Sequence, residues 1–286
     1  MTITADFQIE LDGLLLGAGT PYNLVSIDGL AVPPVRTSDS TLQRRHGVAA
    51  GDDFVGGRGV VIGVELLANG VDEDIDAIAS ALQDVLVPGK SDVVLEFQLP
   101  GRAGGGRRRI TGRPRAHADP HDLRRAHGIP TFLVEFFAPD PRIYDATPGS
   151  VTTNLPTSGS GSSFPWTFPV NFGGTTDSGS VVVTNEGNFD ALPVFRIDGP
   201  VVNPEIENVT TGETLSLTID VDAADFLEID TAAPSVLLNG TASRFPNVST
   251  ASVFPRLAPG DNELRFRATT DTAATLKTDW RSAWIA

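Results

Sequence analysis

The chain has 286 residues, of which 40% are hydrophobic and 20% charged, and this composition is typical of a globular protein with room for two domains. Its formal net charge of −15 disfavours binding to nucleic acid or to anionic lipid, and no apolar run approaches the roughly 18–20 residues that span a membrane. The absence of cysteine excludes disulfides and thiolate zinc sites.

Residues 1–145 predict a small antiparallel sheet with one helix laid across it, in the form of a split β-barrel. Phe7, Ile9 and Leu11 alternate with polar residues, which predicts a half-buried strand within residues 2–16. Further strands are expected at residues 22–27, 59–68, 92–99, 107–115 and 131–137. Residues 71–87 predict the helix, because their apolar residues recur at helical spacing, acidic residues crowd the first turns and Pro88-Gly89 follows.

Two segments of this domain have no clear periodicity. Residues 32–54 read as a long loop with at most one short strand, and either a contact surface or disorder is expected there. Residues 101–106 read as a glycine-rich hairpin tip whose contacts stay open. Basic residues follow at Arg107, Arg108, Arg109, Arg113 and Arg115. Because alternate residues of a strand point to opposite faces, consecutive arginines do not form one patch, and a contact with acidic protein is favoured over phosphate binding.

The strand at residues 131–137 is apolar on both faces, which predicts burial on both sides. One face carries Phe132, Val134 and Phe136. The sequence Ala-Pro-Asp-Pro then ends the strand, because proline removes a backbone donor and extends the residue before it. Residues 146–163 contain hardly a core residue and are predicted to be a linker.

Residues 164–286 predict a second, all-β domain. It opens with aromatic residues and prolines over residues 164–172, and strands then recur about every ten residues. The expected strands are residues 180–185, 193–198, 205–209, 213–221, 226–230, 235–238, 252–257, 262–268 and 275–285. Short strands with a turn after each are typical of a two-sheet sandwich of jelly-roll type.

Two groups of residues have side chains that could carry chemistry. His117, Asp119, His121, Asp122 and His127 could ligate a divalent metal, but a solvated loop is favoured because Arg124 and Arg125 lie among them. The pairs Asp220/Asp222 and Glu228/Asp230 each share a strand face, as a glycosidase dyad does, but in so acidic a chain solvated faces are favoured. No nucleophile motif is present in the sequence, so we expect no catalytic residue, metal or cofactor.

The order of these parts resembles the distal tail proteins of long-tailed bacteriophages, which are also called minor tail proteins. The resemblance is carried by VEFFAPDPRIYD with its Asp140-Pro141 and Tyr144, by Gly199–Asn208, by the strand pair Leu227–Thr231 and Val236–Gly240, and by Leu257–Phe266. It implies a ring-forming β-barrel-like first domain and a galectin-like or jelly-roll second domain. It further implies a structural virion protein at the tail tip, which joins the tail tube to the hub or baseplate and helps host attachment.

The implied partners are further copies of the chain in a hexamer, the tail tube protein, and the tail-tip hub or a tail-associated protein. Receptor-binding proteins or a host surface glycan are further expected partners, and genome DNA would cross the lumen without specific binding or membrane insertion. For the subunit interface we expect Phe132, Val134, Phe136, Arg107 and Arg109. The alternative function is a carbohydrate-binding module, with Trp166, Trp280 and Trp284 as the saccharide contacts.

Overall fold

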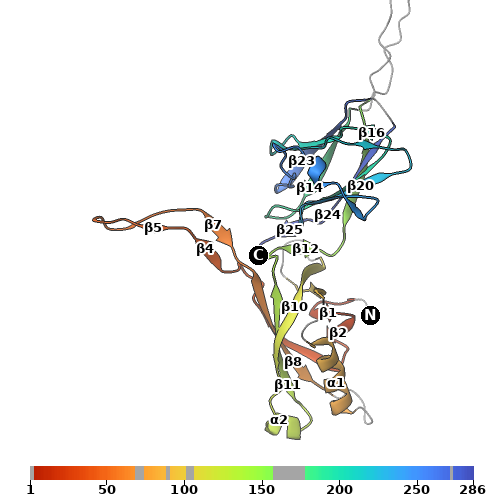
Figure 1. The fold of residues 1–286 in the computed structure, drawn as a ribbon. Coiled ribbons are helices and arrows are strands. Elements are labelled where there is room, and N and C mark those ends of the chain that lie inside the picture. Colours follow the sequence, from red (N-terminus) through yellow and green to blue (C-terminus); the bar gives the residue numbers. More distant parts are fainter. Residues whose placement is uncertain (1–2, 68–73, 88–90, 101–105, 157–177, 271–272) are drawn as a thin grey trace, which may run out of the picture. The chain divides into compact units, whose positions relative to one another are not determined.

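The computed structural model describes residues 3–67, 74–87, 91–100, 106–156, 178–270 and 273–286. The described chain is mainly β, as predicted (Figure 1). It divides into two compact units: unit 1 comprises Met1–Ala146 with Trp284–Ala286, and unit 2 comprises Thr147–Ala283. The last residues of the sequence therefore belong to the first unit.

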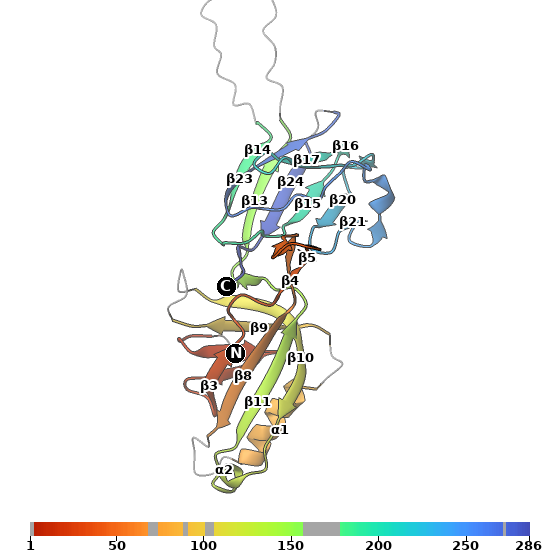
Figure 2. The same ribbon diagram turned by 90° about the vertical axis from the view of Figure 1, so that its left-hand side faces the viewer.

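Unit 1 contains a curled antiparallel sheet in the order β2-β1-β9-β10-β11-β8-β3 (Figure 2). The strands are β1 (Gln8–Leu11), β2 (Leu14–Gly17), β3 (Tyr22–Asp28), β8 (Arg58–Leu66), β9 (Val93–Gln98), β10 (Arg108–Ala118) and β11 (Thr131–Ala138). The end strands β2 and β3 lie beside each other, and no ladder joins them within the described residues. The sheet therefore has the form of an open, split barrel. β12 (Ile143–Asp145) pairs with β10 and with β25 (Ala283–Trp284).

The helix α1 (Ile75–Val85) packs its apolar stripe on this sheet, as the helical spacing predicted. Asp74 caps it by accepting a hydrogen bond from the Asp76 backbone N–H at 3.0 Å. Ala79 and Leu82 of the helix are buried. Residues 71–73 of the predicted helix lie outside the described residues. A second, four-residue helix, α2 (Leu123–Ala126), replaces part of the predicted loop between β10 and β11.

Two predictions about the N-terminal strands and loops are wrong. The single strand expected within residues 2–16 is a hairpin, because Asp12 and Gly13 both have positive φ, of 49° and 83°, and reverse the chain. The long loop expected at residues 32–54 is a two-stranded ribbon, which we call the arm. Its strands are β4 (Val35–Thr37), β5 (Ser40–Thr41), β6 (Val48–Ala49) and β7 (Asp53–Val55), with β4 paired to β7 and β5 to β6.

Unit 2 consists of two main antiparallel sheets with their apolar residues between them. One sheet has the order β13-β24-β15-β20-β21-β22 and the other β14-β23-β17-β18, while β16 pairs with β19. The bounds are β13 (Gly149–Asn154), β14 (Ser180–Asn185), β15 (Val194–Asp198), β16 (Val201–Val202), β17 (Glu205–Asn208), β18 (Glu213–Ser216), β19 (Asp220–Val221), β20 (Phe226–Asp230), β21 (Ser235–Leu238), β22 (Ala242–Ser243), the 3-10 helix η1 (Phe245–Asn247), β23 (Gly260–Arg267) and β24 (Thr275–Trp280). Inward residues such as Phe195, Ile229, Phe266 and Leu276 are fully buried. The predicted sandwich is therefore present.

Three predictions for this unit need correction. Residues 149–154 of the predicted linker form the strand β13, which pairs along its whole length with β24. Residues 252–257 form only an isolated bridge, in which Leu257 pairs with Ala191. The predicted last strand is interrupted, because β24 ends at Trp280 and β25 begins at Ala283. The aromatic entry segment at residues 164–172 lies outside the described residues.

Neither α1 nor α2, the α-helices of the described part of the chain, has the length and hydropathy needed to cross a membrane.

Candidate assembly surfaces

The apolar residues predicted for a subunit interface on β11 face the core of unit 1. Phe132, Val134 and Phe136 are at most 2% exposed, and they pack with the buried residues of β8 and β10. They are therefore unavailable to a second subunit, and their assignment to an interface is wrong. Burial on both faces is also wrong, because Leu133 on the opposite face is 45% exposed. Both faces of this strand are apolar in sequence, so period two alone did not identify the core side.

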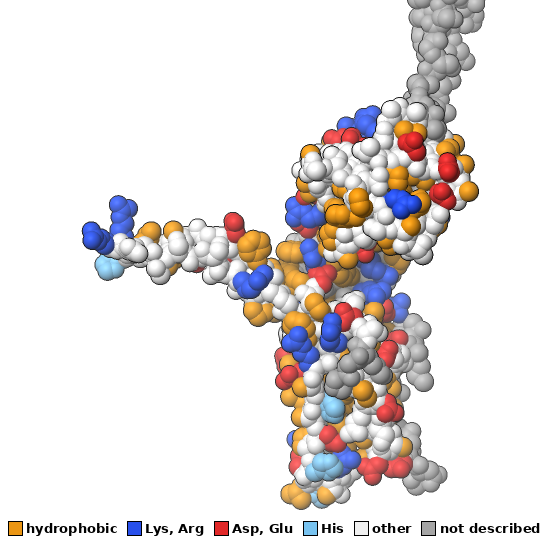
Figure 3. Space-filling model, in the orientation of Figure 1, with side chains coloured by type: hydrophobic (Ala, Val, Ile, Leu, Met, Phe, Trp, Pro, Cys, Tyr) orange, Lys and Arg blue, Asp and Glu red, His pale blue; other side chains and the backbone are white. Residues whose placement is uncertain are grey.

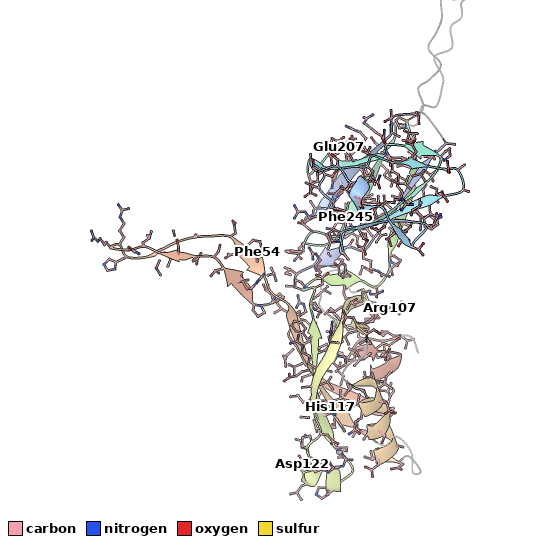
Figure 4. All side chains as sticks on the ribbon, viewed as in Figure 1. Phe54, Arg107, His117, Asp122, Glu207 and Phe245 are labelled. Atoms are coloured by element: carbon pink, nitrogen blue, oxygen red, sulfur yellow. The ribbon has the colours of Figure 1, made fainter. Side chains whose placement is uncertain are left out.

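The consecutive arginines of β10 alternate in burial as strand geometry requires. Arg108 is buried, forms an ion pair with Asp145 and places its guanidinium carbon 3.6 Å from the centroid of the Trp284 ring. Arg107 and Arg109 are both half-buried (Figure 4 labels Arg107). A role of Arg107 and Arg109 at a subunit interface stays a prediction, whereas Arg108 makes its contacts within unit 1.

The tryptophans predicted to contact saccharide do not form one exposed platform. Trp284 is 8% exposed and lies in the core of unit 1 against Arg108. Trp280 is half-buried, and its indole N–H donates to the Thr184 carbonyl at 3.0 Å. Trp166 lies outside the described residues. Burial therefore removes Trp284 as a saccharide contact.

An aromatic pair that the sequence did not single out, of which one ring is exposed and the other half-buried, lies elsewhere on unit 2. The rings of Phe245 and Phe254 stack with their centroids 6.2 Å apart and their planes 11° from parallel. Phe245, labelled in Figure 4, is 48% exposed, and neighbouring Val253 is exposed as well. No alternation marks these residues, because they lie in η1 and in an irregular segment.

The histidine-rich segment after β10 is held by charge pairs within the chain. Asp119 accepts from Arg125 at 2.8 Å and from the Gln83 amide at 3.1 Å, and Arg125 also contacts Asp76 at 2.9 Å. Asp122 caps α2 by accepting from the Arg124 and Arg125 backbone N–H groups. His117 and Asp122 are labelled in Figure 4. Within the described residues no group of three or more His, Cys, Asp or Glu is placed to hold a metal ion.

The carboxylates considered for a glycosidase dyad lie on β19 and β20, except Asp222, which follows the end of β19. Asp220, Asp222 and Glu228 are exposed, and Asp230 accepts hydrogen bonds from the backbone N–H groups of the turn that follows it. The described geometry gives these residues structural or solvent-facing positions.

The Asp140–Tyr144 turn, which carried much of the family resemblance, is closed by its own side chains. The Tyr144 hydroxyl donates to the Asp140 carboxylate at 2.6 Å, and Arg142 donates to the other carboxylate oxygen at 3.0 Å. Burial, together with the neighbouring Asp140 carboxylate, raises the pKa of the Tyr144 phenol above its usual range. The turn fixes the direction in which the chain leaves β11 and enters β12.

Two buried asparagines hold together a part of unit 2 that also carried the family resemblance, around Leu257–Phe266. Asn208 donates to the Arg256 carbonyl at 2.6 Å and to the Asn262 side-chain oxygen at 3.1 Å. Asn262 donates in turn to the Ala258 and Gly260 carbonyls. Both asparagines are fully buried. They provide hydrogen bonds for an irregular segment that has few ladder partners, which explains why residues 252–257 need no regular strand.

The arm is the largest feature that the sequence analysis missed. Every described residue of β4, β5 and β6 is exposed, and among its large apolar residues Val35 is 46%, Val48 56% and Phe54 57% exposed. Figure 3 shows hydrophobic side chains along the arm and basic side chains at its tip. The Gly56 N–H donates to the Pro34 carbonyl at 2.8 Å, so the two ends of the arm meet. A ribbon exposed on both faces has no buried side, and so its sequence has no period-two pattern.

Comparison with known proteins gives one family match and similar folds. Residues 186–284 match the model of the family described as siphovirus-type tail component, C-terminal domain. The sequence matches none of the curated proteins with which it was compared. Among solved structures, the chain is similar to the SPP1 Dit (gp 19.1) protein, described as a paradigm of the hub adsorption apparatus of phages that infect Gram-positive bacteria. The identity is 14%, the TM-score is 0.65, and the match covers 95% of this chain and 97% of that one.

A weaker likeness is found to the phage P2 baseplate in its activated conformation with calcium, with 13% identity, a TM-score of 0.48, and coverage of 95% of this chain and 97% of that one. The family model over residues 186–284 and the shared fold over nearly the whole chain confirm the resemblance to the distal tail proteins of long-tailed bacteriophages.

Proposed function

We propose that copies of this chain assemble into a hexameric ring at the distal end of the tail tube. The ring joins the tube to the tail-tip hub or baseplate and helps host attachment. The similar proteins named above are tail and baseplate proteins. In this chain itself, the single observation that supports assembly is the exposed arm.

Contacts within its own chain do not stabilise the arm enough to keep it folded as a ribbon. A two-stranded ribbon is at best marginally stable in water, because it has no core to offset the entropy lost on ordering it. Val35, Val48 and Phe54 are each about half exposed in the isolated chain. Apolar burial contributes about 25 cal/mol per Å² removed from water, so packing of these side chains against a second molecule would stabilise the arm.

The net charge of −15 suits a ring through which DNA passes. An acidic lumen wall repels the phosphate backbone, so the genome does not adhere while it moves. In this proposal the tube protein contacts one side of the ring and the hub the other. Receptor-binding proteins or a host surface glycan are engaged through unit 2.

Electron microscopy of the purified chain, with its mass in solution measured by light scattering, tests ring formation. We expect closed sixfold rings with a central hole. A chain that stays monomeric up to about 1 mM, where association worth ~4 kcal/mol becomes visible, contradicts self-assembly.

A variant without the arm tests whether the arm carries assembly. Because Pro34 and Gly56 are hydrogen-bonded, residues 35–55 can be replaced by a two-residue Asn-Gly turn with little change to the sheet. We expect the variant to fold with an unchanged unfolding midpoint and to remain monomeric. The matched control is Leu123→Ser, which removes a 78% exposed apolar side chain at α2 and should leave ring formation intact.

A second candidate function, saccharide binding by unit 2, is favoured by the exposed Phe245 ring, which stacks on the half-buried Phe254, since sugar rings stack on aromatic faces. A glycan array with the full chain should show saturable binding that Phe245→Ala removes. Binding that Phe245→Ala leaves unchanged contradicts this site.

A further inference from the structure

The tip of the arm carries cations that have no acidic partner among the described residues. Arg44, Arg45 and His46 are consecutive and exposed, and none forms an ion pair within the described residues. Positive φ values at Arg44, 81°, and at Gly47, 104°, turn the chain sharply there. The tip is therefore a compact basic projection on a protein whose net charge is −15.

An acidic hollow lies on the outer face of β1 and β9 in the same unit. It has a volume of about 340 Å³, and its wall includes Glu10, Asp12, Asp92 and Glu96. Asp92 is paired with Arg113 at 2.8 Å.

Two carboxylates of this hollow are placed against each other. Glu10 and Glu96 occupy directly opposed positions in the β1–β9 ladder, and neither forms an ion pair within the described residues. Arg109 stands opposite Glu96 on the β10 side. Like charges that face each other across a ladder destabilise it, so a cation brought to this position from outside removes a repulsion as well as forming a contact.

We propose that the basic tip of the arm of one copy docks in the acidic hollow of the next copy. This inference rests on the proposed ring and adds the contact that sets the neighbour's position. The tip and the hollow are different surfaces, so each copy offers one and receives the other. Such heterologous contacts generate rings when the rotation between copies closes.

The dimensions of the arm agree with this contact. From its base at Val35 to its tip at Arg44 the arm rises over about ten residues, which at ~3.3 Å per residue spans roughly 30 Å. A domain of this size has a radius of gyration of roughly 15 Å, so the arm reaches across about one neighbouring subunit. Arginine suits the site because its planar guanidinium can contact two carboxylate oxygens at once.

Charge reversal tests the contact in the full-length chain. We expect Arg44→Glu with Arg45→Glu to weaken association on the order of tenfold or more, and Glu10→Arg with Glu96→Arg to do the same. When the two reversed chains are mixed, tip and hollow are again of opposite charge at the mixed contact, so association between them should recover. Light scattering across a concentration series at low salt measures all three. The matched controls are Arg36→Glu on the arm and Asp220→Arg with Asp222→Arg on unit 2, which should change little.

Cysteine cross-linking locates the contact, because the chain has no cysteine of its own. Arg45→Cys on one copy and Glu10→Cys on another should form an intermolecular disulfide under mild oxidation, whereas Arg36→Cys with Glu10→Cys should not. Rings that form while the reversals have no effect and this disulfide is absent overturn the docking contact and leave the proposed function standing. A chain that forms neither rings nor the disulfide overturns both.

Discussion

Arg58 is the residue at which a single substitution should most clearly separate the stabilities of the two units. Its side chain is completely buried, and it donates to the carbonyls of Pro141 at 2.9 Å, Gly29 at 2.7 Å, Ala31 at 2.6 Å and Ile285 at 2.6 Å. These carbonyls come from the base of the arm, the exit from β11 and the last residues of the sequence. The guanidinium therefore joins three segments that are far apart in the chain.

The expected loss can be estimated for Arg58→Met, which keeps much of the volume and removes the donors. Hydrogen bonds to a charged group contribute about 1.5–3 kcal/mol each, and four are lost. Removing the guanidinium also recovers its desolvation cost, which is several kcal/mol. Because four carbonyls lose the donor that holds their three segments together, we expect unit 1 to lose on the order of 3–5 kcal/mol.

Hydrogen exchange measured by mass spectrometry resolves the two units separately. Protection should fall over β8, β11 and residues 284–286 and should stay unchanged over the strands of unit 2. Arg58→Lys should be intermediate, since an ammonium lacks the planar fork of donors. Arg36→Met, at an exposed arginine of the arm, is the control and should stay within about 0.5 kcal/mol of the parent. A loss below about 1 kcal/mol for Arg58→Met, or an equal loss in unit 2, would refute this reasoning.

Three further predictions concern side chains that are used within the units. The chain has two tyrosines, and burial raises the pKa of both Tyr22 and Tyr144, so tyrosinate absorbance should develop at a higher pH in the folded chain than in the unfolded chain. Because the folded pKa values are raised, the stability that the two neutral phenols contribute is fully present below the unfolded pKa and is lost as the pH rises above it. Unfolding midpoints measured from pH 8 to 11 should therefore fall, and a folded chain in which both tyrosines titrate at their ordinary pKa would contradict the burial. Asn208→Leu leaves the Arg256 carbonyl without its donor and should cost unit 2 about 2–4 kcal/mol in urea unfolding, with faster proteolysis before β23. Gly29→Ala should lower the stability of unit 1 by about 1–3 kcal/mol, because Gly29 has a φ of 89° and a Cβ there would overlap the Gly59 carbonyl; an unchanged thermal midpoint would argue against this backbone geometry.

Regular elements were predictable where one face of the chain is buried and the other is not. The strands β3, β8, β9 and β20 and the helix α1 were all found near their predicted bounds, because alternation or helical spacing records the side that faces the core. The arm was missed for the converse reason: both of its faces are largely exposed, so its sequence has no alternation of apolar and polar residues.

The β11 residues predicted for the subunit interface were assigned wrongly because both faces of this strand are apolar in sequence. On β11, Phe132 and Phe137 are chemically alike in sequence, yet Phe132 lies in the core and Phe137 beneath the guanidinium of Arg115, at 3.5 Å from the ring centroid. The burial of Arg58 was equally unpredictable, because its partners lie at positions 29, 31, 141 and 285, which only the folded chain brings together.

The arginines of this chain fall into two groups: those that pair with carboxylates of their own unit, and those at the tip of the arm, which we propose contact another copy. In unit 2, Arg196, Arg256 and Arg265 each pair with a carboxylate of the same unit. At the tip of the arm, Arg44 and Arg45 have no such pair within the described residues. Apolar burial along the arm is non-directional and would hold a neighbour in several positions, whereas paired charges are satisfied in only one. In the proposed ring the apolar arm would therefore supply most of the affinity, and the basic tip would select the register that lets the ring close.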